Sequence, residues 1–176
     1  MYPFLRLTRQ FLKYRNKPLE FGDTHVSTMR CWPWDLDPWM ELNNGRTLTL
    51  YDLGRLPLFH RTGILKIAKN RGWGFTVAGS SVRYRRRIVS LEKITMRTRA
   101  VGWDDRFFYV EQSIWNQKGE CANQVLIRAA LLSKGGMLPP RHLVEAIGWQ
   151  GDPPVLPEWV QNWVEADATR PWPPEI

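Results

Sequence analysis

The sequence predicts an α+β fold in which a curved antiparallel β-sheet wraps around one long central helix. Two observations lead to this prediction. Residues 44–59 carry apolar side chains around most of the helix circumference, which is typical of a helix buried on every side. Several long strand-like runs follow, separated by short turns, and their apolar faces need a common partner. A chain of 176 residues is long enough for one domain with a substantial core.

The chain begins with a short basic segment, residues 3–15, whose pattern predicts an amphipathic helix. Its apolar side would be formed by Phe4, Leu5, Phe11 and Leu12. We expect this helix to pack onto the same subunit or a neighbouring one. Contact with a membrane surface is the alternative.

An acidic loop lies between a predicted strand, residues 24–32, and the central helix. The loop carries three carboxylates, those of Asp35, Asp37 and Glu41. Asn43 and Asn44 follow, and a short amide side chain is a good N-cap for the first turn of a helix. The N-terminus of a helix holds partial positive charge and free N–H donors. A carboxylate beside such donors is a plausible place to polarise and attack a carbonyl group.

The rest of the chain supplies the sheet and a tail. Pro57 predicts a kink or an early end of the central helix, and residues 64–71 predict a short second helix closed by Gly72. A further short helix is expected from the paired prolines at 139–140 to residue 147. The strands are predicted at residues 74–87, 90–103, 106–115 and 120–132. We expect residues 1–150 to form a single domain and the Pro- and Trp-rich residues 151–176 to be a tail that packs on it.

The charge of the chain is uneven. Residues 1–150 hold 24 Lys and Arg against 12 Asp and Glu, whereas residues 151–176 hold one against five. A basic body suits an anionic partner such as the phosphates of coenzyme A, a nucleic acid or a membrane surface. Cys31 and Cys121 form no C-x-x-C motif and give no disulfide framework. No stretch is apolar enough to span a membrane and no signal-peptide pattern is visible, so we expect a cytoplasmic protein.

The acidic loop and the residues after it resemble a known family. In that family D-x-D, three residues, His, one residue and Asn-Asn open the central helix. Asp35, Asp37, Asn43 and Asn44 match this pattern, while Glu41 stands where His is commonest. The stretches G-R-T-L-T-L-Y-D-L-G-R and A-G-S-S-V-R-Y-R-R are also similar. The chain therefore resembles, over roughly residues 24–133, the hotdog-fold acyl-CoA thioesterases of the 4-hydroxybenzoyl-CoA thioesterase-like group.

The resemblance implies an activity, a site and an assembly. It implies hydrolysis of an acyl-CoA, with Asp37 as nucleophile or general base and the backbone N–H of Asn44 or Gly45 polarising the carbonyl. It also implies a homo-oligomer, a dimer or a tetramer, with sites at the subunit interface. No separate cofactor and no metal are expected, because the coenzyme A moiety enters with the substrate. Without the resemblance, Asp35 and Asp37 are interpreted as capping acids, and we retain that role for Asp35.

Glu41 is the departure from the family pattern. It can act as a second carboxylate, a general base beside Asp37. It can equally be a solvated loop acid, or mark a hotdog module that binds acyl-CoA or a lipid-like ligand without turnover.

A basic cluster is the candidate binding site for the coenzyme A phosphates. In a strand, residues 83, 85 and 87 share one face, and guanidinium groups suit phosphate oxygens. We therefore select Arg83, Arg85 and Arg86 as candidates, with a solvated strand end as the alternative. Ser80 and Ser81 are candidates for contact with the thioester or pantetheine, or are ordinary strand residues. A nucleic-acid binder is a third hypothesis, disfavoured because no binding motif is present and the acidic loop would repel phosphate.

Overall fold

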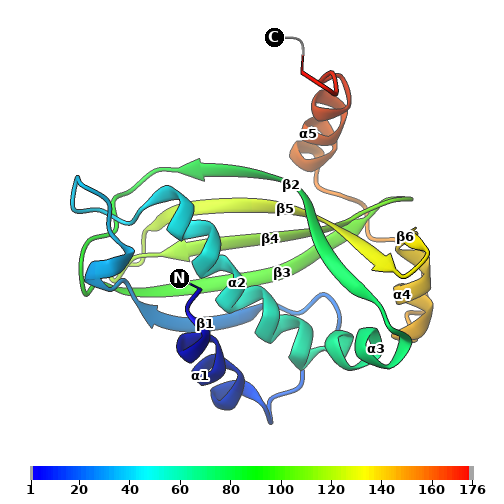
Figure 1. Cartoon of the computed structure of the whole chain (residues 1–176), viewed down its shortest axis with the longest axis horizontal. Coiled ribbons are helices and arrows are strands. Elements are labelled where there is room, and N and C mark those ends of the chain that lie inside the picture. Colours follow the sequence, from blue (N-terminus) through cyan, green and yellow to red (C-terminus); the bar gives the residue numbers. More distant parts are fainter. Residues whose placement is uncertain (1, 175–176) are drawn as a thin grey trace.

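A six-stranded antiparallel sheet curls around one central helix in the computed structural model, which describes residues 2–174 (Figure 1). Residue 1 of the predicted domain and residues 175–176 of the predicted tail lie outside the described residues. The strand order is β1-β3-β4-β5-β2, and β6 pairs with β5. The strands are β1 (His25–Arg30), β2 (Gly74–Tyr84), β3 (Lys93–Trp103), β4 (Phe108–Trp115), β5 (Cys121–Ser133) and β6 (Gly136–Leu138). The predicted α+β hotdog architecture is confirmed.

The central helix is α2, Asn44–Arg61, and its side chains form the middle of the core. Leu50, Tyr51 and Leu53 are fully buried, as the all-round apolar pattern predicts. The early end predicted at Pro57 is wrong, since the helix continues for four residues beyond it. Leu58 and Phe59 are buried in the core, and this packing outweighs the one backbone hydrogen bond that a proline removes.

Gly54 lets α2 lie directly on the sheet. A Cβ atom at this position would come within 2.7 Å of Thr98 Oγ1 on β3, and closer still to Met96 Sδ. Beside this contact, the buried Gln112 of β4 donates from Nε2 to the backbone oxygen of Tyr51 at 2.8 Å and to Thr98 Oγ1 at 3.0 Å. Arg55 donates in turn to Gln112 Oε1 at 2.8 Å. Helix and sheet are therefore held in one orientation by close packing and by a satisfied polar network.

The predicted N-terminal helix is α1, Phe4–Tyr14, and it packs beside α2 (Figure 1). Its inner side buries Tyr14 and Gln10, and Gln10 Nε2 donates to the backbone oxygen of Thr28 at 3.2 Å. The four apolar residues predicted to share one side do not pack together. Phe11 meets His60 edge to face, whereas Phe4, Leu5 and Leu12 remain exposed.

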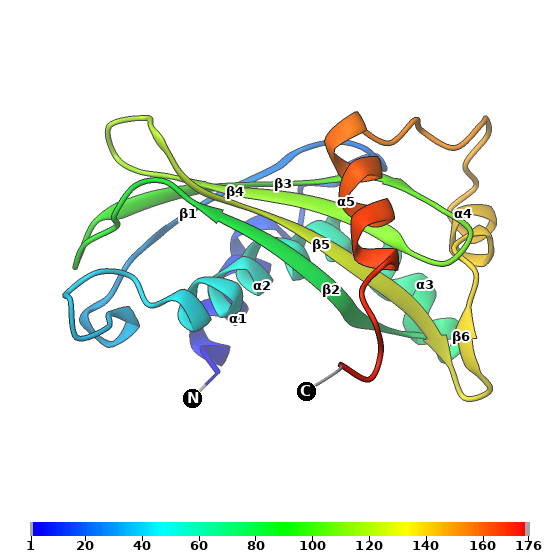
Figure 2. The same cartoon turned by 90° about the horizontal axis from the view of Figure 1, so that it is seen from above.

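The remaining helices cap the ends and the back of the sheet. They are α3 (Ile64–Arg71), closed by Gly72 as predicted, α4 (Arg141–Ala146) and α5 (Glu158–Ala168). Helix α5 crosses the face of the sheet opposite α2, where Val160 is buried against Tyr109 and Leu126 (Figure 2). None of the helices within residues 2–174 has the length and apolar character needed to cross a bilayer.

Candidate functional site

The N-terminal tip of α2 is capped on one side by Asn43. Its Oδ1 accepts a hydrogen bond from the backbone N–H of Arg46 at 3.0 Å, as expected for an N-cap. Asn44 and Gly45 are the first two residues of the helix, and both are exposed. The two backbone donors predicted to polarise a carbonyl therefore lie at an accessible helix end.

Asp37 lies at the start of a tight loop that precedes Asn43, the N-cap of α2. Its backbone N–H donates to the backbone oxygen of Glu41 at 2.9 Å. Its Oδ1 accepts from the N–H of Trp39 at 2.9 Å and from that of Glu41 at 3.4 Å. Met40 inside the loop has φ 60°, which is uncommon for a residue with a side chain. Backbone strain of this kind persists only where surrounding bonds maintain it.

Asp35 is a buried junction between three elements. Its carboxylate accepts from Arg6 Nη1 of α1 and Arg46 Nε of α2, each at 2.7 Å, and from the N–H of Trp32 at 3.0 Å. Burial alone would raise the pKa of Asp35, but the Trp32 N–H and the two guanidinium groups outweigh it and hold the pKa below its ordinary value. The side chain therefore fixes the loop and the helix tip as an ionised structural group.

A polar pocket of about 220 Å³ opens beside the tip, and we call it the basic pocket. Glu41 and Asn44 line one side of it, and Arg87 Nε pairs with Glu41 Oε2 at 3.0 Å. The inner end is formed by Asn123, whose Oδ1 accepts from the buried Tyr51 hydroxyl at 2.6 Å. Its lining comprises Glu41, Leu42, Asn44, Thr47, Tyr84, Arg85, Arg86, Arg87, Ile88 and Asn123. The pocket combines a helix N-terminus with three guanidinium groups, which is suitable for phosphate.

The predicted arginine cluster is divided by the end of β2. The strand ends at Tyr84, so the prediction of a strand through residue 87 with one basic face is wrong. Arg85 and Arg86 instead both donate their backbone N–H to the oxygen of Ala122, at 2.8 and 3.0 Å, in an irregular turn. This turn brings Arg85, Arg86 and Arg87 to the same pocket although they are consecutive.

The other predicted binding residues lie elsewhere on β2. Arg83 and Ser81 line a separate hollow beside Trp159 of α5, on the outer face of the sheet. Ser80 is exposed and lies on the inner face with Tyr84, since strand residues alternate. The structure thus brings together Glu41, Asn44, Arg85 and Arg86, and separates Arg83 and Ser81 from them. Asp37 is hydrogen-bonded to Glu41 and Gly45 follows Asn44 in α2, but neither lines the pocket.

Sequence reasoning missed several residues around the helix tip, and Asn123 and Arg46 are the most informative of them. Asn123 gave no signal, because a single polar residue in a predicted strand has no distinguishing pattern. Arg46 did give a usable signal. A cation in the first turn of a helix interacts unfavourably with the helix dipole, so its presence there indicates a nearby acid that compensates it. That acid is Asp35.

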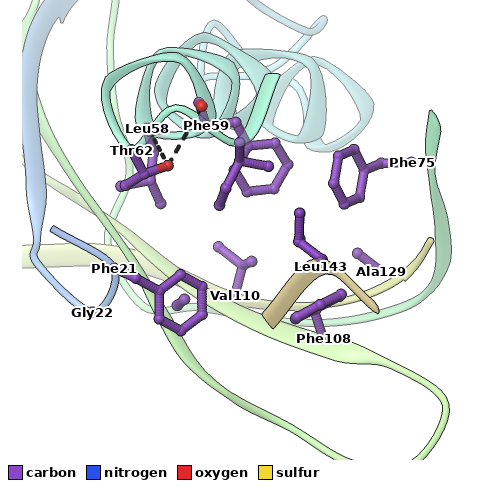
Figure 3. Close-up of a pocket in the computed structure, with 12 residues that line it drawn as sticks. Phe21, Gly22, Leu58, Phe59, Thr62, Phe75, Phe108, Val110, Ala129 and Leu143 are labelled. Atoms are coloured by element: carbon purple, nitrogen blue, oxygen red, sulfur yellow. Dashed lines mark hydrogen bonds between the residues drawn. The ribbon is translucent and has the colours of Figure 1, made fainter. Parts of the chain in front are cut away.

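A second cavity, enclosed and apolar, lies under the C-terminal half of α2 (Figure 3). Phe59, Phe75 and Leu143 point into it from three different elements. Its volume of about 20 Å³ is close to the room that one water molecule needs. It is a packing gap and not a substrate site. Within residues 2–174, no three His, Cys, Asp or Glu side chains are grouped so that they could hold a metal ion.

The curled sheet around a buried helix, with a carboxylate loop at the helix tip, defines the class of protein. Residues 31–164 match the model of the thioesterase-like superfamily, and the chain belongs to that superfamily. This confirms the resemblance seen in the loop motif.

Among individual proteins, the chain is similar to protein THEM6 of Xenopus laevis. The two are 30% identical over 164 residues, which cover 92% of this chain and 78% of that protein. Two solved structures share the fold. A probable thioesterase of Escherichia coli, YbaW, has a TM-score of 0.66 at 18% identity and covers 70% of this chain and 96% of its own. A hypothetical protein of Staphylococcus aureus, solved in complex with CoA, has a TM-score of 0.62 at 10% identity and covers 82% of this chain and 96% of its own.

Proposed function

We propose that this protein hydrolyses an acyl-CoA to the free acid and coenzyme A at the N-terminal tip of α2. Membership of the thioesterase-like superfamily supports thioester hydrolysis as the class of chemistry. One observation carries the assignment to the tip: a loop with two carboxylates, Asp37 and Glu41, adjoins an exposed helix N-terminus and a pocket with three arginines.

In the proposed reaction, Asp37 acts through Oδ2, because Oδ1 accepts the loop hydrogen bonds. The N–H of Asn44 or Gly45 stabilises the oxyanion that forms on the thioester carbonyl. In the general-base route, Asp37 takes a proton from water as the water oxygen bonds to the carbonyl carbon; the carbon–sulfur bond then breaks and Asp37 returns the proton to the sulfur, giving the free acid and the coenzyme A thiol. In the nucleophilic route, Asp37 bonds to the carbonyl carbon, the carbon–sulfur bond breaks and the departing thiolate takes a proton from solvent; water then cleaves the mixed anhydride to the free acid and the Asp37 carboxylate. Label in Asp37 after a single turnover in ¹⁸O-labelled water would identify the anhydride route with water attack at the Asp37 carboxyl carbon, because the general-base route places ¹⁸O only in the free acid.

The basic pocket is the proposed site for the coenzyme A phosphates. Arg85 and Arg86 lie at its edge, and the relative of known structure from Staphylococcus aureus was solved with CoA bound. Glu41 is the second carboxylate of the proposed site, held at the rim of the pocket by its ion pair with Arg87.

The test is a thiol-release assay on a panel of acyl-CoAs. We expect Asp37→Asn to lower kcat by roughly 10²–10⁴-fold, as for loss of a general base or nucleophile, and Glu41→Gln to have a smaller effect. Asp105→Asn, in an exposed turn, is the matched control and should retain wild-type kcat. Turnover that survives in the Asp37→Asn, Glu41→Gln double variant would remove the site assignment.

A second candidate function is binding of acyl-CoA or another lipid-like ligand without turnover. It is favoured by the replacement of the usual His by Glu41 and by the use of Asp37 Oδ1 in the loop. Tight binding of acyl-CoA with no thiol release across the panel would establish it in place of hydrolysis.

A further inference from the structure

A large groove lies on the side of the α2 tip away from the basic pocket. It has a volume of about 740 Å³, which is within the range of ligand sites in proteins. Three segments enclose it: residues 2–6 at the start of α1, residues 34–36 of the loop, and residues 43–49 at the start of α2. We call it the α1 groove.

The walls of the α1 groove are apolar side chains that the fold leaves uncovered. Phe4 is 68% exposed, Leu5 89% and Trp34 67%, and all three line it. Single apolar residues on a surface are ordinary, but three around one hollow indicate a binding surface. An apolar occupant would remove these side chains from water and gain the free energy of burying them.

The floor of the groove is charged but internally paired. Arg6 and Arg46 both bond to the carboxylate of Asp35, and the side chains of both arginines are 17% exposed. Arg6 Nη2 also donates to the backbone oxygen of Arg30 at 2.8 Å. A hydrocarbon placed over this floor would leave these charges bonded to their partners, so covering them costs less than covering unpaired charges.

The groove and the basic pocket are lined by consecutive residues at the tip of α2. Asn43 lines the α1 groove, and the next residue, Asn44, lines the basic pocket. A thioester held at the helix tip would thus have the basic pocket on one side and the apolar groove on the other. The enclosed cavity of Figure 3 is not an alternative, since its volume is about 20 Å³.

We propose that the α1 groove binds the hydrocarbon chain of the acyl group, so that the substrate is a long-chain aliphatic acyl-CoA. This inference rests on the proposed function. Helix α1 lies outside the residues that match the superfamily model, so the proposed acyl site includes an element that the model does not describe.

Photo-crosslinking tests the location of the chain without depending on turnover. The probe is a hexadecyl thioether of coenzyme A, which cannot be hydrolysed, with a diazirine at the end of the alkyl chain. We expect mass spectrometry to find the label on residues 2–6 or 34–36. Label on Phe59, Phe75 or Leu143 would place the chain in the enclosed cavity, and label confined to other surfaces would assign the groove to another occupant. Either result overturns the proposal.

A groove-filling variant tests specificity. Thr49→Trp places a large side chain in the groove, and Leu12→Trp, on an exposed position of α1 outside it, is the matched control. We expect Thr49→Trp to lower kcat/KM for hexadecanoyl-CoA at least tenfold and to leave acetyl-CoA and butanoyl-CoA within twofold, while Leu12→Trp changes neither. An equal loss at every chain length, or an unchanged profile, overturns the proposal.

The two proposals fail in different ways. If no acyl-CoA is hydrolysed by the wild-type protein, the proposed function fails. The proposal that the groove binds the alkyl chain is then tested by the affinity for the hexadecyl thioether alone. Thr49→Trp should lower this affinity tenfold and Leu12→Trp should leave it unchanged.

Discussion

Two aspartates of one short motif have opposite surroundings. Asp35 is fully buried and receives three donors, whereas Asp37 is partly exposed and bonds only within its own loop through Oδ1. The difference follows from what packs around them, because α1 contributes Arg6 and α2 contributes Arg46 to the first aspartate alone. The motif therefore combines Asp35, a structural acid, with Asp37, an acid whose carboxylate is partly open to solvent.

Replacing Asp35 should destabilise the protein and change its response to acid. In Asp35→Asn, two guanidinium groups lose their buried counter-ion, a change that costs about 3–5 kcal/mol of unfolding free energy. The pKa of Asp35 is lower in the folded than in the unfolded state, so its ionisation stabilises the fold above the unfolded pKa, about 4, and this contribution is lost as pH falls through the folded pKa. Urea denaturation between pH 7 and pH 3 should show a shallower acid loss in Asp35→Asn. An unchanged acid slope would contradict the role of this carboxylate.

The arginines of the basic pocket should act on the nucleotide end of the substrate. Arg85→Ala with Arg86→Ala removes two cations from the proposed phosphate site, so KM for an acyl-CoA should rise about tenfold or more, or 1.4 kcal/mol. KM for the matching acyl-pantetheine, which lacks the nucleotide phosphates, should not change. Arg83→Ala is the control, since Arg83 lies on the outer face of the sheet. A rise in KM for both substrates would exclude phosphate recognition here.

The elements of this fold differ in how far sequence determines them. The central helix was predictable, because its apolar pattern and its Asn caps agree. Its length was not predictable. Pro57 favours an early end of the helix, but the packing of the buried Leu58 and Phe59 keeps the chain helical beyond it. The end of β2 at Tyr84 was equally hidden, because the arginines after it fit a strand pattern as well as a turn. The three-residue β6 is too short to produce a periodic pattern.

The same division applies to the candidate site. The loop carboxylates and the helix tip were predictable from local spacing, since they lie within ten residues. The α1 groove and Asn123 were not, because they depend on segments far apart in sequence that only the packing of α1 and β5 brings to the tip.

The contact between α2 and β3 should be sensitive to a single methyl group. Gly54→Ala would force Cβ against Met96 and Thr98, and overpacking of this kind costs about 1–3 kcal/mol. Gly45→Ala, at the exposed start of the same helix, has its nearest neighbour at 3.4 Å and should keep or slightly raise the wild-type unfolding free energy. Thermal and chemical denaturation measure both. Equal stability of the two variants would show that the helix can move away from the sheet without cost.

At the scale of the whole molecule, β2 is an edge strand of eleven residues, paired with β5 on one side only. Such an edge presents unpaired backbone donors and acceptors to another chain. We propose that two copies join through β2 to form the homodimer. Val77, half exposed on this strand, would then lie at the interface.

A charge on this edge should weaken the dimer. Val77→Lys places a cation that natural edge strands use to prevent pairing, so the dissociation constant in sedimentation should rise at least about tenfold, or 1.4 kcal/mol. Lys118→Glu, in the distant turn before β5, is the charge-change control. A monomeric wild-type protein, or an unchanged dissociation constant, would refute assembly through β2.

Helix α5 has a consequence for higher assembly. It lies across the outer face of the sheet, with Val160 buried and Arg128 joined to Asp167 at 2.5 Å. Two copies of the chain therefore cannot bring the sheet surface beneath α5 into direct contact while the C-terminal helix remains in place. A back-to-back contact across this face would have to include α5 itself.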